Sequence, residues 1–515
     1  MNFVYVLLSA ALYALSFPEP AWWWFSFIAL VPFFIALQRT ATFAGRLAIG
    51  LLWGTAMVVA MGYWLFIPLV SHYGVAVHTA TLFIFAFVVV PVSSLYLFFA
   101  SAYHLLQGRS AVFHALVLPS LWVLIEFVKT RLPFLIPWGD IGYAAIPFTP
   151  FVQVADLGGV YALTFLIVMI NGLLTALLLN IFAAGKERGT IRLSAGNKRR
   201  KSMLATGGAL IMAVILPVIY GEYRIAEMNA DRDGISETDT IEAVIVQGNH
   251  SLSDRWSGMG FDNRLKTYLD LSMPQSTDGR RIVVWPETML NAGRLDDRFF
   301  MEMMRWVGSD SLLVSGGLFE DRKTGDTYNS AYFISGQGRL MRYDKQILLP
   351  YAEAVPPIDL LGRYYTAPDH FSRGRTPVCI PTPLGAIGTS ICLEILYPEF
   401  VRMGVKNGGM LLVNLSNDAW FGKSAMPYLH MAAARMRAIE NRRFLLRAAN
   451  SGFSALIGPD GRILTSTGLF TRQRITGRFS TIDHQTLYTR FGEWIVFLAA
   501  GIVGICALDR LGKPI

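Results

Sequence analysis

A cysteine at the end of an apolar run is the residue of this sequence best suited to covalent chemistry. The run 385–391 reads as a buried strand, and Cys392 follows it at a turn that leads into a helix. Backbone N–H groups and the helix dipole at such a turn favour a thiolate and any oxyanion that forms beside it. We therefore expect Cys392 to act as a nucleophile.

Two charged residues in similar contexts complete a set that could transfer an acyl group. Glu287 ends an apolar strand beside Trp285 and Pro286, where partial desolvation suits a general base. Lys345 precedes an apolar run, and a lysine held in a pocket supplies fixed positive charge for a tetrahedral oxyanion. Together with Cys392 they would be the base, the electrophile and the nucleophile of acyl transfer.

Each of these residues also has an ordinary structural explanation. A Glu after a strand is usually a cap or a surface residue, a Lys beside Asp344 is usually a surface pair, and a lone buried Cys is usually inert. Cys379 and Cys392 could also form a disulfide in an oxidising compartment. Glu287, Lys345 and Cys392 nevertheless occur together in one chain, each in a strand-end context, and this combination favours the catalytic interpretation.

The composition indicates that a large part of the chain lies in a membrane. Hydrophobic residues make up 53% of the 515 residues and charged residues only 16%, which is typical of membrane insertion. We expect a membrane domain at 1–220 with seven transmembrane helices and an eighth helix at 493–508. The seven apolar runs lie near 3–17, 21–37, 47–68, 75–104, 111–128, 158–182 and 203–220. A cleaved signal peptide is the alternative for the first run, but that run has no basic segment before it.

The basic residues predict the orientation of these helices. With the N-terminus in the cytoplasm, the inside loops hold Arg39, Arg46, Arg109, Lys186, Arg188, Arg192, Lys198, Arg199, Arg200 and Lys201, and the outside loops hold only Lys129 and Arg131. This bias predicts that residue 221 onward lies outside. Because the net charge of +9 is explained by membrane topology, we expect no nucleic-acid partner.

An apolar loop at 130–157 lies on the predicted outer side. It is rich in aromatic residues, broken by Pro and Gly, and contains Trp138. It could line an entrance for lipid, or it could be an ordinary belt of interfacial aromatic residues.

The region 240–487 has the pattern of an α/β domain and follows a polar linker at 221–239. Apolar, β-branched runs alternate with amphipathic stretches, which is typical of sheets covered by helices. The predicted strands are 241–247, 281–285, 311–316, 329–335, 386–391, 410–415, 444–449 and 453–457, and the predicted helices are 261–272, 297–307 and 427–441.

The three candidate residues lie in motifs that resemble those of the nitrilase superfamily. The motifs are Trp285-Pro286-Glu287, Tyr343-Asp344-Lys345 and Ile391-Cys392-Leu393-Glu394. With membrane helices on both sides, the chain is similar to one branch of that superfamily, the bacterial apolipoprotein N-acyltransferases. The resemblance implies a four-layer αββα sandwich attached to a polytopic α-helical membrane domain.

The resemblance also implies a ping-pong reaction that needs no cofactor and no metal. Glu287 takes the thiol proton of Cys392, and the thiolate attacks a phospholipid, typically phosphatidylethanolamine, while Lys345 holds the oxyanion. The resulting thioester is then attacked by the α-amino group of the diacylglyceryl-cysteine of an apolipoprotein. The implied location is the bacterial inner membrane, with the catalytic domain facing the periplasm.

Further residues take their roles only from this resemblance. Glu353 is expected to orient Lys345, and Glu394 to orient the incoming group; Trp256 and Trp420 would be mobile residues near the acyl entrance, or ordinary packing residues. The sequence departs from the family at Leu393, where a Tyr often follows the nucleophile. Two other functions remain open, a membrane-anchored amidase or hydrolase and a non-catalytic lipid-binding scaffold.

Overall fold

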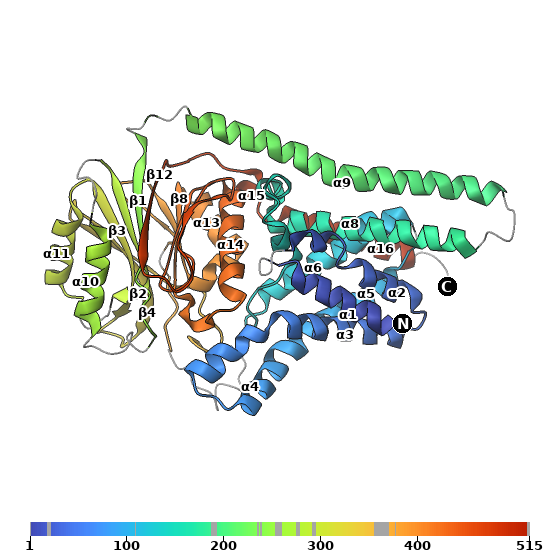
Figure 1. Cartoon of the computed structure of the whole chain (residues 1–515), viewed down its shortest axis with the longest axis horizontal. Coiled ribbons are helices and arrows are strands. Elements are labelled where there is room, and N and C mark those ends of the chain that lie inside the picture. Colours follow the sequence, from blue (N-terminus) through green and yellow to red (C-terminus); the bar gives the residue numbers. More distant parts are fainter. Residues whose placement is uncertain are drawn as a thin grey trace. The chain divides into compact units, whose positions relative to one another are not determined.

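The chain forms two compact units. A computed structural model describes residues 2–17, 22–108, 110–186, 193–233, 236, 239–252, 260–273, 279–290, 295–354, 370–375 and 377–511 (Figure 1). The first unit comprises Met1–Arg224 and Glu493–Ile515, and the second comprises Ile225–Gly492. The apolar ends of the chain thus belong to one unit and the polar middle to the other.

The first unit is helical. Within the described residues, five helical segments are long and apolar enough to cross a membrane: Phe43–Met61, Val77–Leu106, Phe113–Arg131, Ala155–Phe182 and Arg199–Ala230. The helices are α1 (Asn2–Leu15), α2 (Val31–Arg39), α3 (Phe43–Met61), α4 (Val77–Ile84), α5 (Val90–Leu106), α6 (Leu118–Arg131), α7 (Thr149–Val152), α8 (Ala155–Lys186), α9 (Leu193–Asp233) and α16 (Trp494–Leu511). They are joined by the short helical turns η1 (Trp23–Phe27), η2 (Tyr63–Leu65), η3 (Ile67–His72), η4 (Phe85–Val89), η5 (Phe113–Val117) and η6 (Ile141–Ala145).

The expected apolar runs are present largely as helices, and the structure differs from the prediction in several details. The first two runs form the shorter segments Asn2–Leu15 and Trp23–Arg39. The run at 75–104 contains the π-helical turn η4 just before Pro91, which has no N–H to continue the α-helical hydrogen-bond pattern. Much of the expected linker is helical, because α9 continues to Asp233 through residues that favour a helix.

Small residues allow the helices of this unit to approach closely. A Cβ at Gly50 of α3 would lie 2.4 Å from the Tyr96 carbonyl oxygen, and one at Gly54 would lie 2.8 Å from the Ser93 Cα, both on α5. Such small residues are typical of helix contacts in membranes, where packing replaces the hydrophobic effect.

A buried polar cluster fixes the loop that follows α6. The Lys129 Nζ lies 2.5 Å from the Asp140 Oδ1 and donates to the Trp138 carbonyl oxygen at 2.9 Å. The Glu126 carboxylate accepts from the Ile141 N–H at 2.9 Å and from the Thr164 hydroxyl at 2.6 Å. These contacts hold the apolar loop against the helices. They also give each buried charge of the cluster a partner.

The second unit contains two six-stranded sheets. The first has the order β12 (Gln473–Phe479), β1 (Ile241–Gln247), β2 (Arg281–Leu290), β3 (Ser311–Glu320), β4 (Thr327–Ser335), β5 (Arg339–Asp344). The second has the order β11 (Ile463–Ser466), β10 (Ala455–Ile457), β9 (Leu445–Ala449), β8 (Leu411–Ser416), β7 (Ile387–Ile391), β6 (Cys379–Ile380). The central strands β1, β2 and β3, and β7, β8 and β9, are parallel.

The two sheets pack face to face between two layers of helices. Strands β1 and β2 contact β9, which places the main core between the sheets. Helices α10 (Phe261–Ser272) and α11 (Asp297–Val307) cover the first sheet, and α13 (Pro398–Lys406) and α14 (Met426–Asn441) contact the second (Figure 1). A further short helix, α15 (Leu487–Phe491), packs on α13 and α14. The predicted combination of membrane helices and an αββα sandwich is confirmed.

Candidate active site

Cys392 lies at a strained turn directly after β7. The residue is 7% exposed and has a φ of 52°, a left-handed conformation that costs a residue with a side chain roughly 1–2 kcal/mol. It begins the five-residue 3-10 turn η11 (Cys392–Leu396), and α13 starts only at Pro398. The thiol is therefore at a strand end, as predicted, but it is not at the start of an α-helix.

Glu287 occupies an irregular part of β2. The pairing of β2 with β3 shifts register between Trp285 and Leu290, and Thr288 has a φ of 54°. Gly316 of β3 faces this distortion, and a Cβ there would lie 2.5 Å from the Glu287 Cα. The sequence motif did not reveal Gly316, because close approach of two backbones depends on the paired strand.

Lys345 follows β5 and is fully enclosed, with 1% of its surface exposed. Its Nζ lies 2.9 Å from the Glu353 Oε1 and 3.4 Å from the Glu287 Oε1. A single lysine therefore bridges two buried carboxylates, and Glu353 contacts Lys345 as the resemblance implies.

Asn329 is a residue of this site that the sequence reasoning did not identify. Its Nδ2 donates to the Glu287 Oε1 at 2.8 Å and to the Glu353 Oε1 at 3.3 Å, and its backbone carbonyl accepts from the Lys345 N–H at 2.8 Å. Asn329 thus fixes the same two carboxylates as Lys345. Its place on β4, beside β5, becomes apparent only once the strands are paired.

The surroundings of Cys392 raise the pKa of its thiol. Burial raises the pKa of Cys392 well above its ordinary value, and the charge of Glu287 raises it further, against the opposing effect of Lys345. Burial alone would lower the pKa of Lys345, but Glu353 and Glu287 outweigh it and keep the ammonium charged. The stabilisation of a thiolate by backbone N–H groups and a helix dipole stays a prediction, and the element that follows β7 is the short turn η11.

The Glu394 carboxylate accepts hydrogen bonds from residues that surround the site. Its carboxylate accepts from the Tyr343 hydroxyl at 2.8 Å and from the backbone N–H groups of Gln346 at 2.7 Å, Ile347 at 3.0 Å and Ile391 at 2.7 Å. Burial raises the pKa of Glu394 to about 7, although these N–H groups lower it. This geometry favours a role in tying the Lys345 segment to the Cys392 turn, instead of the expected contact with an incoming group.

A second buried charged cluster packs beside η11. The Asp418 carboxylate lies 2.7 Å from Arg447 and 2.9 Å from the His430 Nδ1, and all three residues are buried. Although burial raises the pKa of Asp418, Arg447 and His430 hold it below its ordinary value. The negative charge of Asp418 also contributes to the raised pKa of Cys392.

The three tryptophan candidates and Leu393 lie in different parts of the chain. Trp420 lies in the short turn η12 (Asp418–Phe421) and is partly buried. Trp138 belongs to the first unit, is 8% exposed and packs edge-on against Trp64. Trp256 lies outside the described residues, and Leu393 is buried.

All three cysteines have free thiols, including Cys379 and Cys392, which the sequence left open as a disulfide pair. Among the described residues, no group of three or more His, Cys, Asp or Glu side chains is arranged to hold a metal ion.

The comparisons with known proteins agree with this geometry. The carbon-nitrogen hydrolase family matches residues 245–486, and the apolipoprotein N-acyltransferase N-terminal domain family matches residues 9–173. The apolipoprotein N-acyltransferase of Geobacter metallireducens is 28% identical over 99% of this chain and 96% of its own length. That of Haemophilus ducreyi is 26% identical over 90% of this chain and 92% of its own length.

A solved structure of Saccharomyces cerevisiae Nit3, a member of branch 10 of the nitrilase superfamily, covers 47% of this chain and 90% of its own, with 19% identity and a TM-score of 0.38. The two family matches lie one in each structural unit, and the relatives extend over both units. Over nearly its whole length, the chain is similar to the apolipoprotein N-acyltransferases.

Proposed function

We propose that this protein transfers an acyl chain from a phospholipid to the α-amino group of the N-terminal diacylglyceryl-cysteine of apolipoproteins. Cys392 carries the acyl chain between the two substrates as a thioester. The observation that supports this most directly is the buried Lys345 held between Glu287 and Glu353, close enough to Cys392 to influence the pKa of its thiol.

The first half-reaction loads the enzyme. Glu287 removes the Sγ proton as the sulfur attacks the ester carbonyl carbon at the sn-1 position of the phospholipid. The oxygen of the tetrahedral intermediate gains a negative charge, which the Lys345 ammonium stabilises. The C–O bond then breaks, the proton on Glu287 passes to the leaving lysophospholipid oxygen, and a thioester remains on Cys392.

The second half-reaction empties the enzyme. The free amine of the apolipoprotein attacks the thioester carbonyl carbon, and Glu287 accepts a proton from the nitrogen. The C–S bond breaks, the sulfur regains a proton, and an amide is formed. A buried site suits this transfer, because exclusion of water limits hydrolysis of the thioester.

The donor and the location are further parts of the proposal. Phosphatidylethanolamine is the proposed donor on the basis of the family resemblance alone. The excess of Lys and Arg in alternate loops supports an inner-membrane protein whose catalytic unit faces the periplasm. A reporter fused near residue 225 should behave as external, and a cytoplasmic signal would refute this orientation.

An acyl-transfer assay with a diacylglyceryl peptide tests the proposed reaction. Wild-type protein supplied with phospholipid should form an acyl adduct on Cys392 that hydroxylamine removes, and it should acylate the peptide. Cys392→Ala should do neither. Full acylation by Cys392→Ser would disprove the thioester. Release of free fatty acid without acylated peptide would favour a hydrolase, and absence of both products would favour a scaffold.

A further inference from the structure

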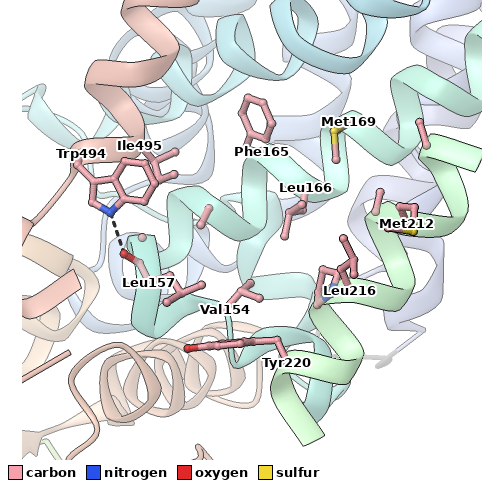
Figure 2. A pocket seen from close by; sticks show the side chains of 15 residues that line it. Val154, Leu157, Phe165, Leu166, Met169, Met212, Leu216, Tyr220, Trp494 and Ile495 are labelled. Carbon is pink, nitrogen blue, oxygen red and sulfur yellow. Dashed lines mark hydrogen bonds between the residues drawn. The ribbon is translucent and has the colours of Figure 1, made fainter. Parts of the chain in front are cut away.

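A groove in the first unit has no place in the proposed reaction. It has a volume of about 610 Å³ and lies between α8, α9 and α16 (Figure 2). Its walls include Phe165 and Met169 of α8, Met212 and Leu216 of α9, and Ile495 of α16. We call it the α8–α9–α16 groove.

The groove exists because α9 packs loosely and because its walls contain small residues. Only 17% of the most apolar stretch of α9 is buried, against 61% for α8. Ala162 of α8 and Ala213 of α9 line the groove, and α8 changes direction at Gly159, which has a φ of 70°. Larger side chains at these positions would close the space.

The lining is apolar except at one end. Tyr220 and Trp494 lie at that end, and Met169 and Met212 lie at the other (Figure 2). The Tyr220 hydroxyl donates to the Asp156 Oδ1 at 2.7 Å, and the Trp494 Nε1 donates to the Leu157 carbonyl oxygen at 2.8 Å. Since Trp and Tyr are enriched where a bilayer meets water, this end corresponds to the headgroup level.

The length of the groove matches one leaflet of a bilayer. Its lining on α9 extends from Ala209 to Tyr220, which corresponds to about 16 Å of helix. The hydrocarbon core of a bilayer is about 30 Å thick, so half of it is about 15 Å. The groove therefore spans one hydrocarbon layer, from the headgroup level toward the midplane.

We infer that the α8–α9–α16 groove binds an acyl chain of a bilayer phospholipid, with the headgroup at the end marked by Tyr220 and Trp494. The apolar walls offer water no hydrogen-bond partner, whereas hydrocarbon gains dispersion contacts there. This lipid site goes beyond the acyl transfer proposed above and does not depend on it.

Photolabelling of the full-length protein tests the site. Cys392→Ala protein, which cannot consume the lipid in the proposed reaction, is reconstituted in vesicles of phosphatidylethanolamine and phosphatidylglycerol. The vesicles contain a trace of phosphatidylethanolamine with a diazirine in one acyl chain, and mass spectrometry locates the adducts. Met212 and Leu216, which line the groove, should be labelled at least about threefold more than Ile211 and Ile215, which are similarly exposed on the same helix but do not line the groove.

Matched substitutions separate the groove from the general lipid surface. Ala213→Phe and Ala162→Phe, on different helices, should each reduce the labelling ratio to about one by filling the groove. Ala205→Phe, on α9 but outside the groove, should leave the ratio unchanged. Equal labelling of both faces in the starting protein would show bulk lipid only and overturn the inference. It would also be overturned by a ratio that neither filling variant changes.

Discussion

Two buried clusters in this molecule contain the same kinds of charged residue but differ in what surrounds them. In the first unit, Lys129 pairs with Asp140 near Glu126. In the second unit, Lys345 lies between Glu287 and Glu353. Each cluster therefore combines one buried lysine with two buried carboxylates.

The difference lies in the partners of these charges. Glu126 and Lys129 are bonded to the backbone at Ile141 and Trp138, so their cluster fixes a loop. Lys345 is instead shared by two carboxylates next to the thiol of Cys392, whose pKa responds to their charges. Residue types alone therefore do not identify an active site; a reactive group within reach of the charges does.

The largest effect is expected from removing the shared lysine. Lys345→Met combined with Glu353→Gln removes one positive and one negative charge, so no additional charge is left buried. The rate of acyl-enzyme formation should fall roughly 100- to 1,000-fold, because the oxyanion loses its cation. Burst kinetics with a chromogenic or mass-labelled acyl donor measure this rate. If the rate of acyl-enzyme formation in folded protein falls by less than about threefold, the Lys345 cluster, like the Lys129 cluster, serves only to hold the structure together.

A smaller loss is expected when the backbone around Glu287 is displaced. Gly316→Ala places a methyl group 2.5 Å from the Glu287 Cα, so the strand must move. Acylation should slow by about 10- to 100-fold, because small misplacements of a catalytic group are costly. Thermal unfolding should be measured in parallel. An unchanged rate would show that the distortion of β2 is not needed to position Glu287.

A smaller but more specific effect is expected on the pKa of Cys392. The rate of alkylation by iodoacetamide should rise with pH through an apparent pKa above that of an ordinary thiol. Because Glu287 raises this pKa, Glu287→Gln should lower it by about one unit or more, while acyl transfer is lost. The pH profile, not the absolute rate, is compared, since access to the thiol also affects the rate. A pKa that is higher in Glu287→Gln would contradict the electrostatics described here.

The smallest change in rate is expected in the other cluster. Lys129→Met should leave the acylation rate of folded protein within about twofold, but should destabilise the protein by about 3–5 kcal/mol because Asp140 loses its buried partner. Lys129→Met with Asp140→Asn should recover part of that stability. Thermal unfolding of the protein in detergent measures the stability of both the single and the double variant. A large loss of rate without loss of stability would show that the first cluster also takes part in the reaction.

Much of the fold could be predicted from hydrophobic patterns. The long apolar runs and the central strands were found because burial on both faces produces continuous apolar sequence. The prediction lacks the strands β5, β6, β11 and β12. Strands β5, β11 and β12 are exposed at several positions and carry polar residues such as Arg339 and Arg478, and β6 has only two residues. The helical continuation of α9 was missed because polar composition was read as a linker.

The site was predictable only in part. Glu287, Lys345 and Cys392 stand in recognisable motifs, and the structure brings all three together. Asn329 and Gly316 act through strands paired with those motifs, so pairing had to be known before they could be found. The raised pKa of the Cys392 thiol could not be predicted either, because it depends on burial and on the surrounding charges, which no local motif specifies.

The Glu394 carboxylate has a consequence for the motions of the second unit. It accepts from the backbone N–H groups of Gln346 and Ile347, next to Lys345, and of Ile391, next to Cys392. Gln346 and Ile347 follow β5 of the first sheet, and Ile391 is the last residue of β7 in the second sheet, yet one buried group holds all three amides. They should therefore exchange their hydrogens with solvent as one cooperative unit. Lys345 and Cys392 would then move apart only when all of the hydrogen bonds to Glu394 open together, and not when either segment fluctuates by itself.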